Sequence, residues 1–405
     1  PGNFTWLPEI GHYVMTTFYP YQWDLNYRNP RVFNEMMYNF LYLANQGMDI
    51  IRIDAVPYIW KELGTNCRNL QQVHTIVRMM RMIGEIVCPG IVLLGEVVME
   101  PEKVAPYFGT VEKPECHMLY NVTTMATTWN TVATRDVRLL KKQMDIVCSL
   151  PKEYTFLNYL RCHDDIGWGL DYAILSEWSM KEVPHKKYLN DYFQGRTEGS
   201  VSRGELYNED PVTGDARFCA TTASMCGIES AGFEQDEEKM ERAVVKDIML
   251  HAYMFTQSGI PMLYSGDEIG QVNDYTYKDD PDKAPDSRYI HRGKFCWELA
   301  ENIEKKGSVQ EKIFHALTRL EEIRRNDAVF SADAEVYTKD YSDTSILWIV
   351  RKAEGRELHA VFNFSDEEKE IWMPEVTEYK TLLTGKTEVI EKTELRSWDF
   401  LWLER

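Results

Sequence analysis

The sequence lacks four features, each of which would place it in a well-defined class at once. None of its eight cysteines forms a C-x-x-C pair, so neither a zinc site nor a disulfide framework is indicated. It has no recognisable signal peptide and no apolar run long enough to span a bilayer. Basic residues are also few, because 45 lysines and arginines stand against 64 acidic residues, which gives a formal net charge of -19. Such a surface repels nucleic acid and anionic membranes, so neither is expected as a partner.

The composition that remains is that of an ordinary soluble protein. Hydrophobic residues make up 44% and charged residues 27% of the chain. Its 405 residues are enough for two or three domains with a large core. We expect a cytoplasmic protein with reduced thiols, and we expect neither a metal nor a cofactor. Because the chain begins with Pro1 rather than Met, we expect its true start, and any export signal, to lie outside this sequence.

Helical segments alternate with apolar strands over the first two thirds of the chain. Residues 28–47 predict a helix, because Asn29 suits the N-cap and Pro30 suits the first helical position. Strands are predicted within residues 47–60, 90–98, 116–121, 154–167 and 260–270, and helices within residues 70–87, 134–147 and 246–259. Nearly continuous apolar strands that alternate with helices are typical of a parallel sheet covered by helices.

Two other regions depart from this alternation. Residues 168–238, which are rich in Gly, Asp and Glu, predict an inserted functional loop or small subdomain between the last two strands. From residue 332 onward, short runs with partial alternation are separated by turns, which is typical of an antiparallel β domain. These runs lie at residues 344–352, 358–365, 369–375, 379–385 and 397–405.

Charged residues interrupt the strand within "GMDIIRIDAVPYIW", residues 47–60. Arg52 and Asp54 are two residues apart, so they share one face of the strand, whereas Ile51 and Ile53 share the other. In a barrel the isoleucines would meet the outer helices. The two charges would then point inward near the C-terminal end of the strand, where the active sites of parallel barrels lie.

Two later strands are also predicted to end in charges. Glu96 lies in "LLGEVV", and His163, Asp164 and Asp165 lie in "RCHDDIGW". One such carboxylate could belong to a structural ion pair. Three charged strand ends at one face indicate catalysis instead, because a buried carboxylate without a partner is costly.

Two carboxylates that flank a scissile bond are what glycoside cleavage requires. Arg52, on the same face as Asp54, would hold Asp54 ionised as a nucleophile. The apolar neighbours of Glu96 would raise the pKa of its carboxyl group and suit it to donate a proton. The sequence therefore predicts a glycosidase-type active site.

Motifs along the whole chain resemble the α-amylase superfamily of retaining glycosidases and transglycosidases. The strand signatures of that family stand here as "IIRIDAV", "LLGEV" and "CHDDIG", in the right order. The segments "TTFYPYQWDLNYRNP", "WKELGTNCRNL", "YNEDPVTGDARFCATTAS" and "PDSRYIHR" are similar to the amylosucrase branch, which uses sucrose as glucosyl donor. The resemblance implies an α/β fold. Residues 1–331 would form the later part of a (β/α)8 TIM barrel with an inserted subdomain, and residues 332–405 an all-β C-terminal domain.

The resemblance also implies a role for each matched residue. Asp54 would be the nucleophile, Glu96 the general acid/base, and Asp164 the carboxylate that binds ring hydroxyls and stabilises the transition state. The residues that would bind substrate are Arg52 and His163 in the glucosyl subsite, Phe18 in the wall of the sugar pocket, Asp165 and Arg288 around the sucrose site, and Arg217 at the acceptor. Without the resemblance, the last three would be interpreted as solvated surface charges.

The activity that the resemblance implies is transfer of glucose from sucrose to an α-glucan or oligosaccharide acceptor. A sucrose hydrolase or another α-glucosidase would use the same residues, and a non-catalytic carbohydrate-binding protein would keep the same fold. The family's N-terminal helical domain and first three barrel strands are not recognisable, and an acidic partner of Arg288 is expected in that part. We therefore expect little activity from the chain alone, which would depend on the missing N-terminal half or on self-association.

Overall fold

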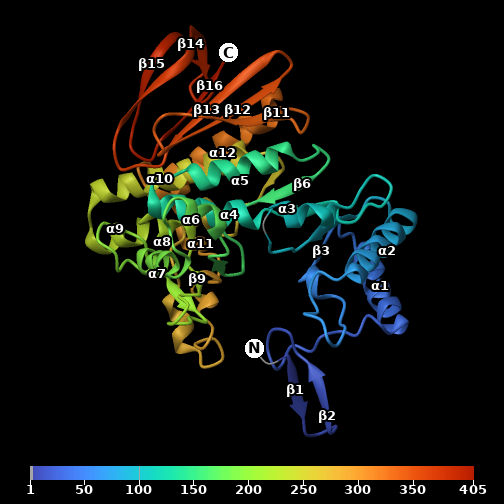
Figure 1. Cartoon of the computed structure of the whole chain (residues 1–405). Helices are drawn as coiled ribbons and strands as arrows, with labels where there is room; N and C mark the ends of the chain where they lie inside the picture. Colours follow the sequence, from blue (N-terminus) through green and yellow to red (C-terminus); the bar gives the residue numbers. More distant parts are fainter. Residues whose placement is uncertain (1–2, 100) are drawn as a thin grey trace. The chain divides into compact units, whose positions relative to one another are not determined.

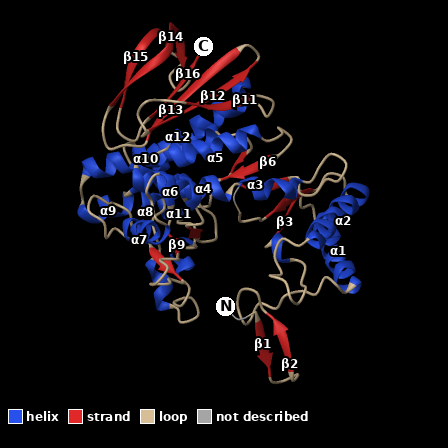
Figure 2. Ribbon diagram, viewed as in Figure 1, coloured by secondary structure: helices blue, strands red, loops and turns tan. Residues whose placement is uncertain are grey.

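The computed structural model describes residues 3–99 and 101–405, which form two compact units. Of the described residues, the first unit comprises 3–99, 101–120 and 153–156, and the second comprises 121–152 and 157–405. Figure 1 labels the elements in chain order, and Figure 2 separates helices from strands. Among the described residues, none of the helices combines the length and the hydropathy needed to cross a membrane.

Unit 1 is built on three parallel strands. Strand β3 (Ile50–Ile53) pairs with β4 (Val92–Gly95), and β4 pairs with β5 (Met118–Tyr120). The strands predicted in these three places are therefore confirmed. The other elements of the unit are the hairpin β1 (Phe4–Leu7) and β2 (His12–Met15), the helices α1 (Pro30–Asn45), α2 (Gln71–Val87) and α3 (Pro101–Val104), the 3-10 turns η1 (Val56–Tyr58) and η2 (Ala105–Phe108), and the start of β6.

The core of unit 1 lies between β3, β4 and the helices α1 and α2; Figure 2 shows α1 and α2 beside β3. Helix α1 begins as predicted, because the side chain of Asn29 accepts a hydrogen bond from the backbone N–H of Arg31 and Pro30 is the first helical residue. The buried residues of this core are Phe33, Met37, Phe40, Ile76, Met80, Ile91 and Leu93. Ile51 and Ile53 pack against it, which confirms that the isoleucines of β3 face the helices.

Gly95, the last residue of β4, has no room for a side chain. A Cβ atom there would lie 2.6 Å from Sγ of Cys116 and 2.9 Å from Cδ2 of Leu119. We expect Gly95→Ala to lower the free energy of unfolding by about 1–3 kcal/mol, the usual cost of overpacking a core. Gly90→Ala is the matched control, because nothing lies within 4 Å of the added Cβ. Urea unfolding measures both variants, and equal loss of stability in the two would contradict the prediction.

Unit 2 contains the other parallel pair, between the end of β6 (Thr155–Asn158) and β10 (Ile260–Pro261). Both strands are shorter than predicted. The chain leaves β6 after Asn158, so residues 161–165 lie beyond the strand rather than at its end, and Arg161 turns inward to pair with Asp267. The chain leaves β10 after Pro261 and turns at Gly266, whose φ of 98° is left-handed and favours glycine.

Four long helices accompany these strands in unit 2, and two of them, α10 and α12, lie beside each other (Figure 1). The four are α4 (Val122–Thr134), α5 (Arg138–Ser149), α10 (Glu237–Thr256) and α12 (Val309–Asn326). Helices α4 and α12 were not predicted. The predicted helices within residues 134–147 and 246–259 correspond to α5 and α10.

Short helices and a small antiparallel sheet lie within and just before the predicted insertion, residues 168–238, and a separate subdomain there stays a prediction. Trp168 is fully buried, stacks on Phe193 and Phe218, and donates a hydrogen bond to Asn190. The antiparallel strands of the small sheet run in the order β7-β9-β8. The elements are β7 (Ile166–Gly167), α6 (Tyr172–Glu177), α7 (Glu182–Phe193), β8 (Glu205–Tyr207), β9 (Arg217–Cys219), α8 (Thr222–Cys226) and α9 (Ile228–Glu234).

The C-terminal part forms a six-stranded antiparallel sheet of order β11-β12-β13-β16-β14-β15, as the predicted fold class requires. The strands are β11 (Glu335–Lys339), β12 (Ile346–Ala353), β13 (Arg356–Asn363), β14 (Lys369–Thr381), β15 (Thr387–Leu395) and β16 (Phe400–Glu404). The runs predicted at 369–375 and 379–385 belong to one strand, β14, with a bulge between Trp372 and Thr377. A domain boundary at residue 331 stays a prediction.

Candidate active site

One guanidinium joins two of the predicted catalytic carboxylates. Nη1 of Arg52 lies 2.6 Å from Oδ1 of Asp54, and Nη2 lies 3.0 Å from Oε1 of Glu96. The strand register explains this arrangement, because Ile53 at the end of β3 lies opposite Gly95 at the end of β4. Asp54 and Glu96 follow these two residues, so they leave the sheet at the same edge. The predicted pairing of Arg52 with Asp54 is therefore present, and Arg52 also pairs with Glu96.

The electrostatics of this group keep Arg52 charged. Burial lowers the pKa of the Arg52 guanidinium, but attraction to Glu96 and the hydrogen bond to Asp54 outweigh it and raise that pKa above its ordinary value. The ring of Tyr120 at the end of β5 lies 5.5 Å from the guanidinium carbon. The side chain of Asp54 is 77% exposed and that of Glu96 is 20% exposed, so Asp54 is the more accessible of the two carboxylates.

Glu96 is held by the backbone as well as by Arg52. The N–H of Ala55 donates a hydrogen bond of 2.9 Å to Oε2 of Glu96, and the N–H of Glu96 donates one of 3.0 Å to the carbonyl of Ile53. Ala55 has a φ of 45°, a left-handed conformation that costs a non-glycine residue on the order of 1–3 kcal/mol. The guanidinium and this backbone N–H are polar neighbours of Glu96 that the sequence did not indicate, and a pKa of Glu96 raised by apolar neighbours stays a prediction.

Phe18, the predicted aromatic wall of the sugar pocket, lies half-exposed in unit 1. Its ring meets that of Tyr58 edge to face, with the centroids 5.2 Å apart. Tyr58 ends the turn η1, which begins two residues after Asp54. The structure therefore brings Phe18 to the segment that carries Asp54.

The remaining predicted site residues form a second group, in unit 2. Nε2 of His163 lies 3.0 Å from Oδ2 of Asp164. Hydrogen bonds to Asp164 and then to Cys162 raise the pKa of His163 to about 10, although partial burial opposes this. Two arginines approach the other oxygen of Asp164, with Arg292 Nη2 at 3.5 Å and Arg288 Nη1 at 4.0 Å.

Arg217 and Arg288 each contact an aspartate of unit 2. Nε of Arg217 lies 3.7 Å from Oδ1 of Asp165. Burial raises the pKa of the Asp165 carboxyl group, and Arg217 partly offsets the effect. Arg288 binds Asp286 through two nitrogens, at 2.9 Å from Nε and 2.7 Å from Nη2. Within this chain Asp286, two residues away, is therefore an acidic partner of Arg288, and a further partner in the missing N-terminal part stays a prediction.

A cation at this group would meet opposition. In the part of the chain that the structure describes, Cys162, His163 and Asp164 place ligand atoms within 4.8 Å of one another. However, His163 is hydrogen-bonded to Asp164, and Arg288 and Arg292 both approach the same carboxylate. Positive charges so close repel a metal ion, and we assign none.

The contact between His163 and Asp164 makes a prediction for titration. Because Asp164 accepts the hydrogen bond from the imidazole, His163 should remain protonated at neutral pH and titrate near 10. In Asp164→Asn the charged acceptor is gone, so the pKa of His163 should fall toward its ordinary value of about 6.5. NMR titration of the histidine ring in both proteins measures the shift. A His163 that titrates near the ordinary value already in the wild type would show that the contact is absent in solution.

Three side chains and one backbone group of these sites were not predicted. Tyr120 lies under Arg52, Asp286 pairs with Arg288, and Arg292 approaches Asp164. The segment "PDSRYIHR" contains both Asp286 and Arg292, so the signal was present in a motif already noted. Nothing in the sequence marks the N–H of Ala55.

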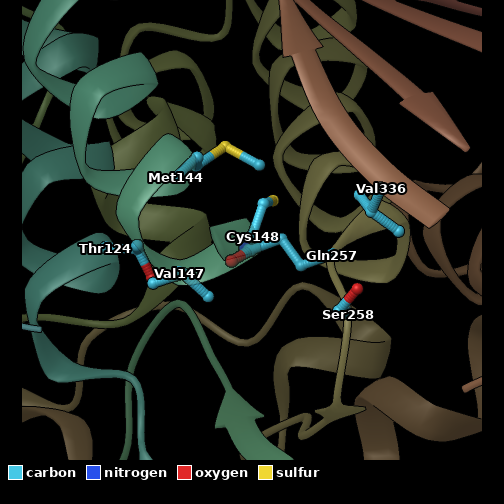
Figure 3. A pocket seen from close by; sticks show the side chains of 7 residues that line it. All are labelled: Thr124, Met144, Val147, Cys148, Gln257, Ser258 and Val336. Carbon is cyan, nitrogen blue, oxygen red and sulfur yellow. The ribbon is translucent and has the colours of Figure 1, made fainter. Parts of the chain in front are cut away.

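The cavity between α4, α5 and β11 in unit 2 is too small to hold a sugar (Figure 3). Its volume is about 10 Å³, room for roughly one water molecule. Small-molecule sites usually enclose about 300–1,000 Å³. The lining residues are Thr124, Met144, Val147, Cys148, Gln257, Ser258 and Val336.

Parallel strands that end in an arginine-linked pair of carboxylates, with an antiparallel sheet after the α/β part, are the arrangement that the resemblance to the α-amylase superfamily leads us to expect. Comparison with known proteins agrees. Residues 2–166 match the alpha-amylase family, described as "Alpha amylase, catalytic domain". This match covers the part of the chain that holds Asp54, Glu96 and Asp164, which is less than half of its 405 residues.

Two kinds of relatives are similar to the chain beyond this segment. Glucosylglycerate phosphorylase of Escherichia coli (strain K12) is 27% identical over 398 residues, which cover 97% of this chain and 66% of that protein. Trehalose synthase of Thermus thermophilus is 27% identical over 270 residues, 66% of this chain and 24% of that protein. The chain thus spans about two thirds or less of the length of these relatives.

Solved structures share the fold at lower identity. Sucrose 6F-phosphate phosphorylase from Thermoanaerobacter thermosaccharolyticum matches with a TM-score of 0.64 and 20% identity, over 89% of this chain and 67% of that chain. The alpha-amylase from H.orenii matches with a TM-score of 0.63 and 17% identity, over 100% of this chain and 70% of that chain. The predicted fold class, part of an α-amylase barrel followed by an all-β domain, is confirmed.

Proposed function

We propose that this protein is a retaining α-glucosyltransferase that takes its glucosyl group from sucrose. Asp54 attacks the anomeric carbon of the glucosyl unit while Glu96 gives a proton to the departing fructose oxygen. The bond from carbon to that oxygen breaks as the bond to Asp54 forms, which leaves a β-glucosyl-enzyme. An acceptor hydroxyl then gives its proton to Glu96 and takes the glucose, so the α configuration is restored.

The observation that carries this proposal is the bridge of Arg52 between Asp54 and Glu96. Retaining enzymes need their two carboxyl groups about 5–5.5 Å apart, whereas inverting enzymes leave room for a water at about 6.5–9.5 Å. A single guanidinium that contacts both carboxylates favours the shorter separation.

The other residues that match the family are assigned supporting roles. Asp164 would bind the ring hydroxyls and stabilise the positive charge that develops on the sugar, with His163 beside it. Arg52, His163 and Phe18 would contact the glucosyl unit. The pairs Asp165–Arg217 and Asp286–Arg288 would shape the fructosyl and acceptor positions. These roles rest on the motif resemblance together with the contacts described above.

The candidate activities differ in the molecule that accepts the glucosyl group. The motifs resemble amylosucrase, for which an α-glucan or oligosaccharide accepts the glucose. A second candidate is phosphorolysis, in which inorganic phosphate takes the glucosyl group. It is favoured by the similarity to glucosylglycerate phosphorylase over 97% of this chain. A sucrose hydrolase, in which water is the acceptor, would use the same carboxylates.

Product analysis of the full-length protein with sucrose tests the proposal. Fructose with little free glucose, accompanied by lengthening α-glucan, supports the transferase. Glucose 1-phosphate that forms only when inorganic phosphate is added supports the phosphorylase, and equal glucose and fructose support the hydrolase. NMR of the first product formed must show the α anomer. Binding of a glucan without turnover of sucrose or any other α-glucoside would overturn the proposal in favour of a carbohydrate-binding protein.

A further inference from the structure

The backbone that carries Asp164 is held by residues far along the chain. Nε of Arg292 donates a hydrogen bond of 2.5 Å to the carbonyl oxygen of His163. Nη2 of the same guanidinium lies 3.5 Å from Oδ1 of Asp164. Nε2 of His291 lies 3.3 Å from the same carbonyl of His163. One arginine therefore contacts both the Asp164 carboxylate and the peptide group that precedes it.

A buried ion pair links the same two segments of the chain. Arg161 and Asp267 are 2% and 3% exposed, and Nε of Arg161 lies 2.7 Å from Oδ1 of Asp267. Nη1 of Arg161 donates a hydrogen bond of 3.2 Å to the carbonyl of His291. The segments 161–164 and 291–292 therefore contact each other twice. Arg161 donates to the carbonyl of His291, and His291 and Arg292 contact the carbonyl of His163.

Arg292 and Arg288 are not equivalent in this arrangement. Arg288 is bound through two nitrogens to Asp286 and approaches Asp164 only at 4.0 Å. The carboxylate that Arg292 contacts is Asp164 itself. The planar guanidinium of Arg292 also presents Nε and Nη2 at a fixed separation. A lysine, which has one nitrogen, cannot hold the carbonyl and the carboxylate in the same way.

We propose that Arg292 is a positioning residue, which orients the Asp164 carboxylate for the transition state by fixing its side chain and the preceding carbonyl together. This inference rests on the proposed function, because it gives the arginine a role in that reaction through Asp164. Arg292 itself contacts no reacting atom in this proposal. Loss of its guanidinium should therefore lower kcat while the substrate affinity changes little.

Kinetics of the full-length protein with sucrose test the proposal. We expect Arg292→Ala to reduce kcat by about a hundredfold, the usual effect of a misplaced catalytic group, with KM within about threefold of wild type. Arg292→Lys should recover less than a tenth of the lost rate, because it keeps the charge but not the two contacts. Added guanidinium ion, below denaturing concentrations, should partly restore Arg292→Ala. Arg242→Ala is the matched control, since Arg242 is exposed and pairs with the exposed Glu238 on the surface of α10.

Some outcomes would overturn the role of Arg292. These are an unchanged kcat in Arg292→Ala, a rise in KM alone, or full activity in Arg292→Lys. If the wild type turns over no α-glucoside, the proposed function fails. Hydrogen exchange then tests whether Arg292 fixes the segment that carries Asp164. The amides of residues 162–165 should exchange faster in Arg292→Ala than in Arg242→Ala, and equal exchange rates would overturn the proposal.

Discussion

Asp54→Asn in the full-length protein is expected to remove sucrose cleavage almost completely, by at least about a thousandfold in kcat. An amide is a poor nucleophile and carries no charge to pair with Arg52, which now holds Asp54 at 2.6 Å. In the proposed mechanism no glucosyl-enzyme forms without attack by Asp54, so both halves of that reaction would be lost. Fructose release under single-turnover conditions measures the effect.

Asp49→Asn is the matched control for this variant. Asp49 is exposed and precedes β3, whereas Asp54 follows the same strand, so the two substitutions make the same chemical change at opposite ends. The control should keep the activity and the stability of the wild type. If Asp54→Asn retained more than a few per cent of the turnover, Asp54 would not be the nucleophile.

Asp267→Ala should have the largest effect on stability. It leaves the Arg161 guanidinium buried without the carboxylate that now lies 2.7 Å away. Breaking one side of a buried ion pair typically costs about 3–5 kcal/mol in the free energy of unfolding. Denaturant unfolding followed by tryptophan fluorescence measures this loss.

Two controls separate the lost pair from a general effect of substitution. The double variant Arg161→Met with Asp267→Leu should recover much of the stability, because apolar residues of similar volume often replace a buried pair without loss. Glu238→Ala, which breaks the exposed pair with Arg242, should cost less than about 1 kcal/mol. A loss in Asp267→Ala no larger than in Glu238→Ala would show that the Arg161–Asp267 pair is not a stabilising contact.

The group of Arg52, Asp54 and Glu96 was predictable because its arrangement depends on local periodicity. Alternation along β3 assigns Arg52 and Asp54 to one face and the isoleucines to the other, and a parallel neighbour brings Glu96 to the same edge. The helix α1 was predictable for a similar reason, since Asn29 and Pro30 give its start within a few residues. Each of these inferences needs only the period of one element.

The contacts that were missed depend on long-range packing. Arg292 is 128 residues from Asp164 in the chain, and no spacing rule predicts such a contact. Helix α4, "VTTMATTWNTVAT", was missed because its many threonines are poor helix formers. Its burial, including the fully buried Trp129, overrides that preference. The length of β6 was overestimated because the apolar run continues to Leu160 after the strand has ended at Asn158.

The four residues of β3 and the aspartate that follows them affect how this protein can change in evolution. Two kinds of contact alternate along this short segment. Arg52 contacts the carboxylates of Asp54 and Glu96, whereas Ile51 and Ile53 pack against the helices. Substitution of Ile51 or Ile53 would mainly change the free energy of unfolding. Deletion or insertion of a single residue within β3 would exchange the two faces, placing the guanidinium among apolar side chains and an isoleucine beside Glu96. Length variation should therefore be confined to the loops around this strand, and sequence variation within it should occur one face at a time.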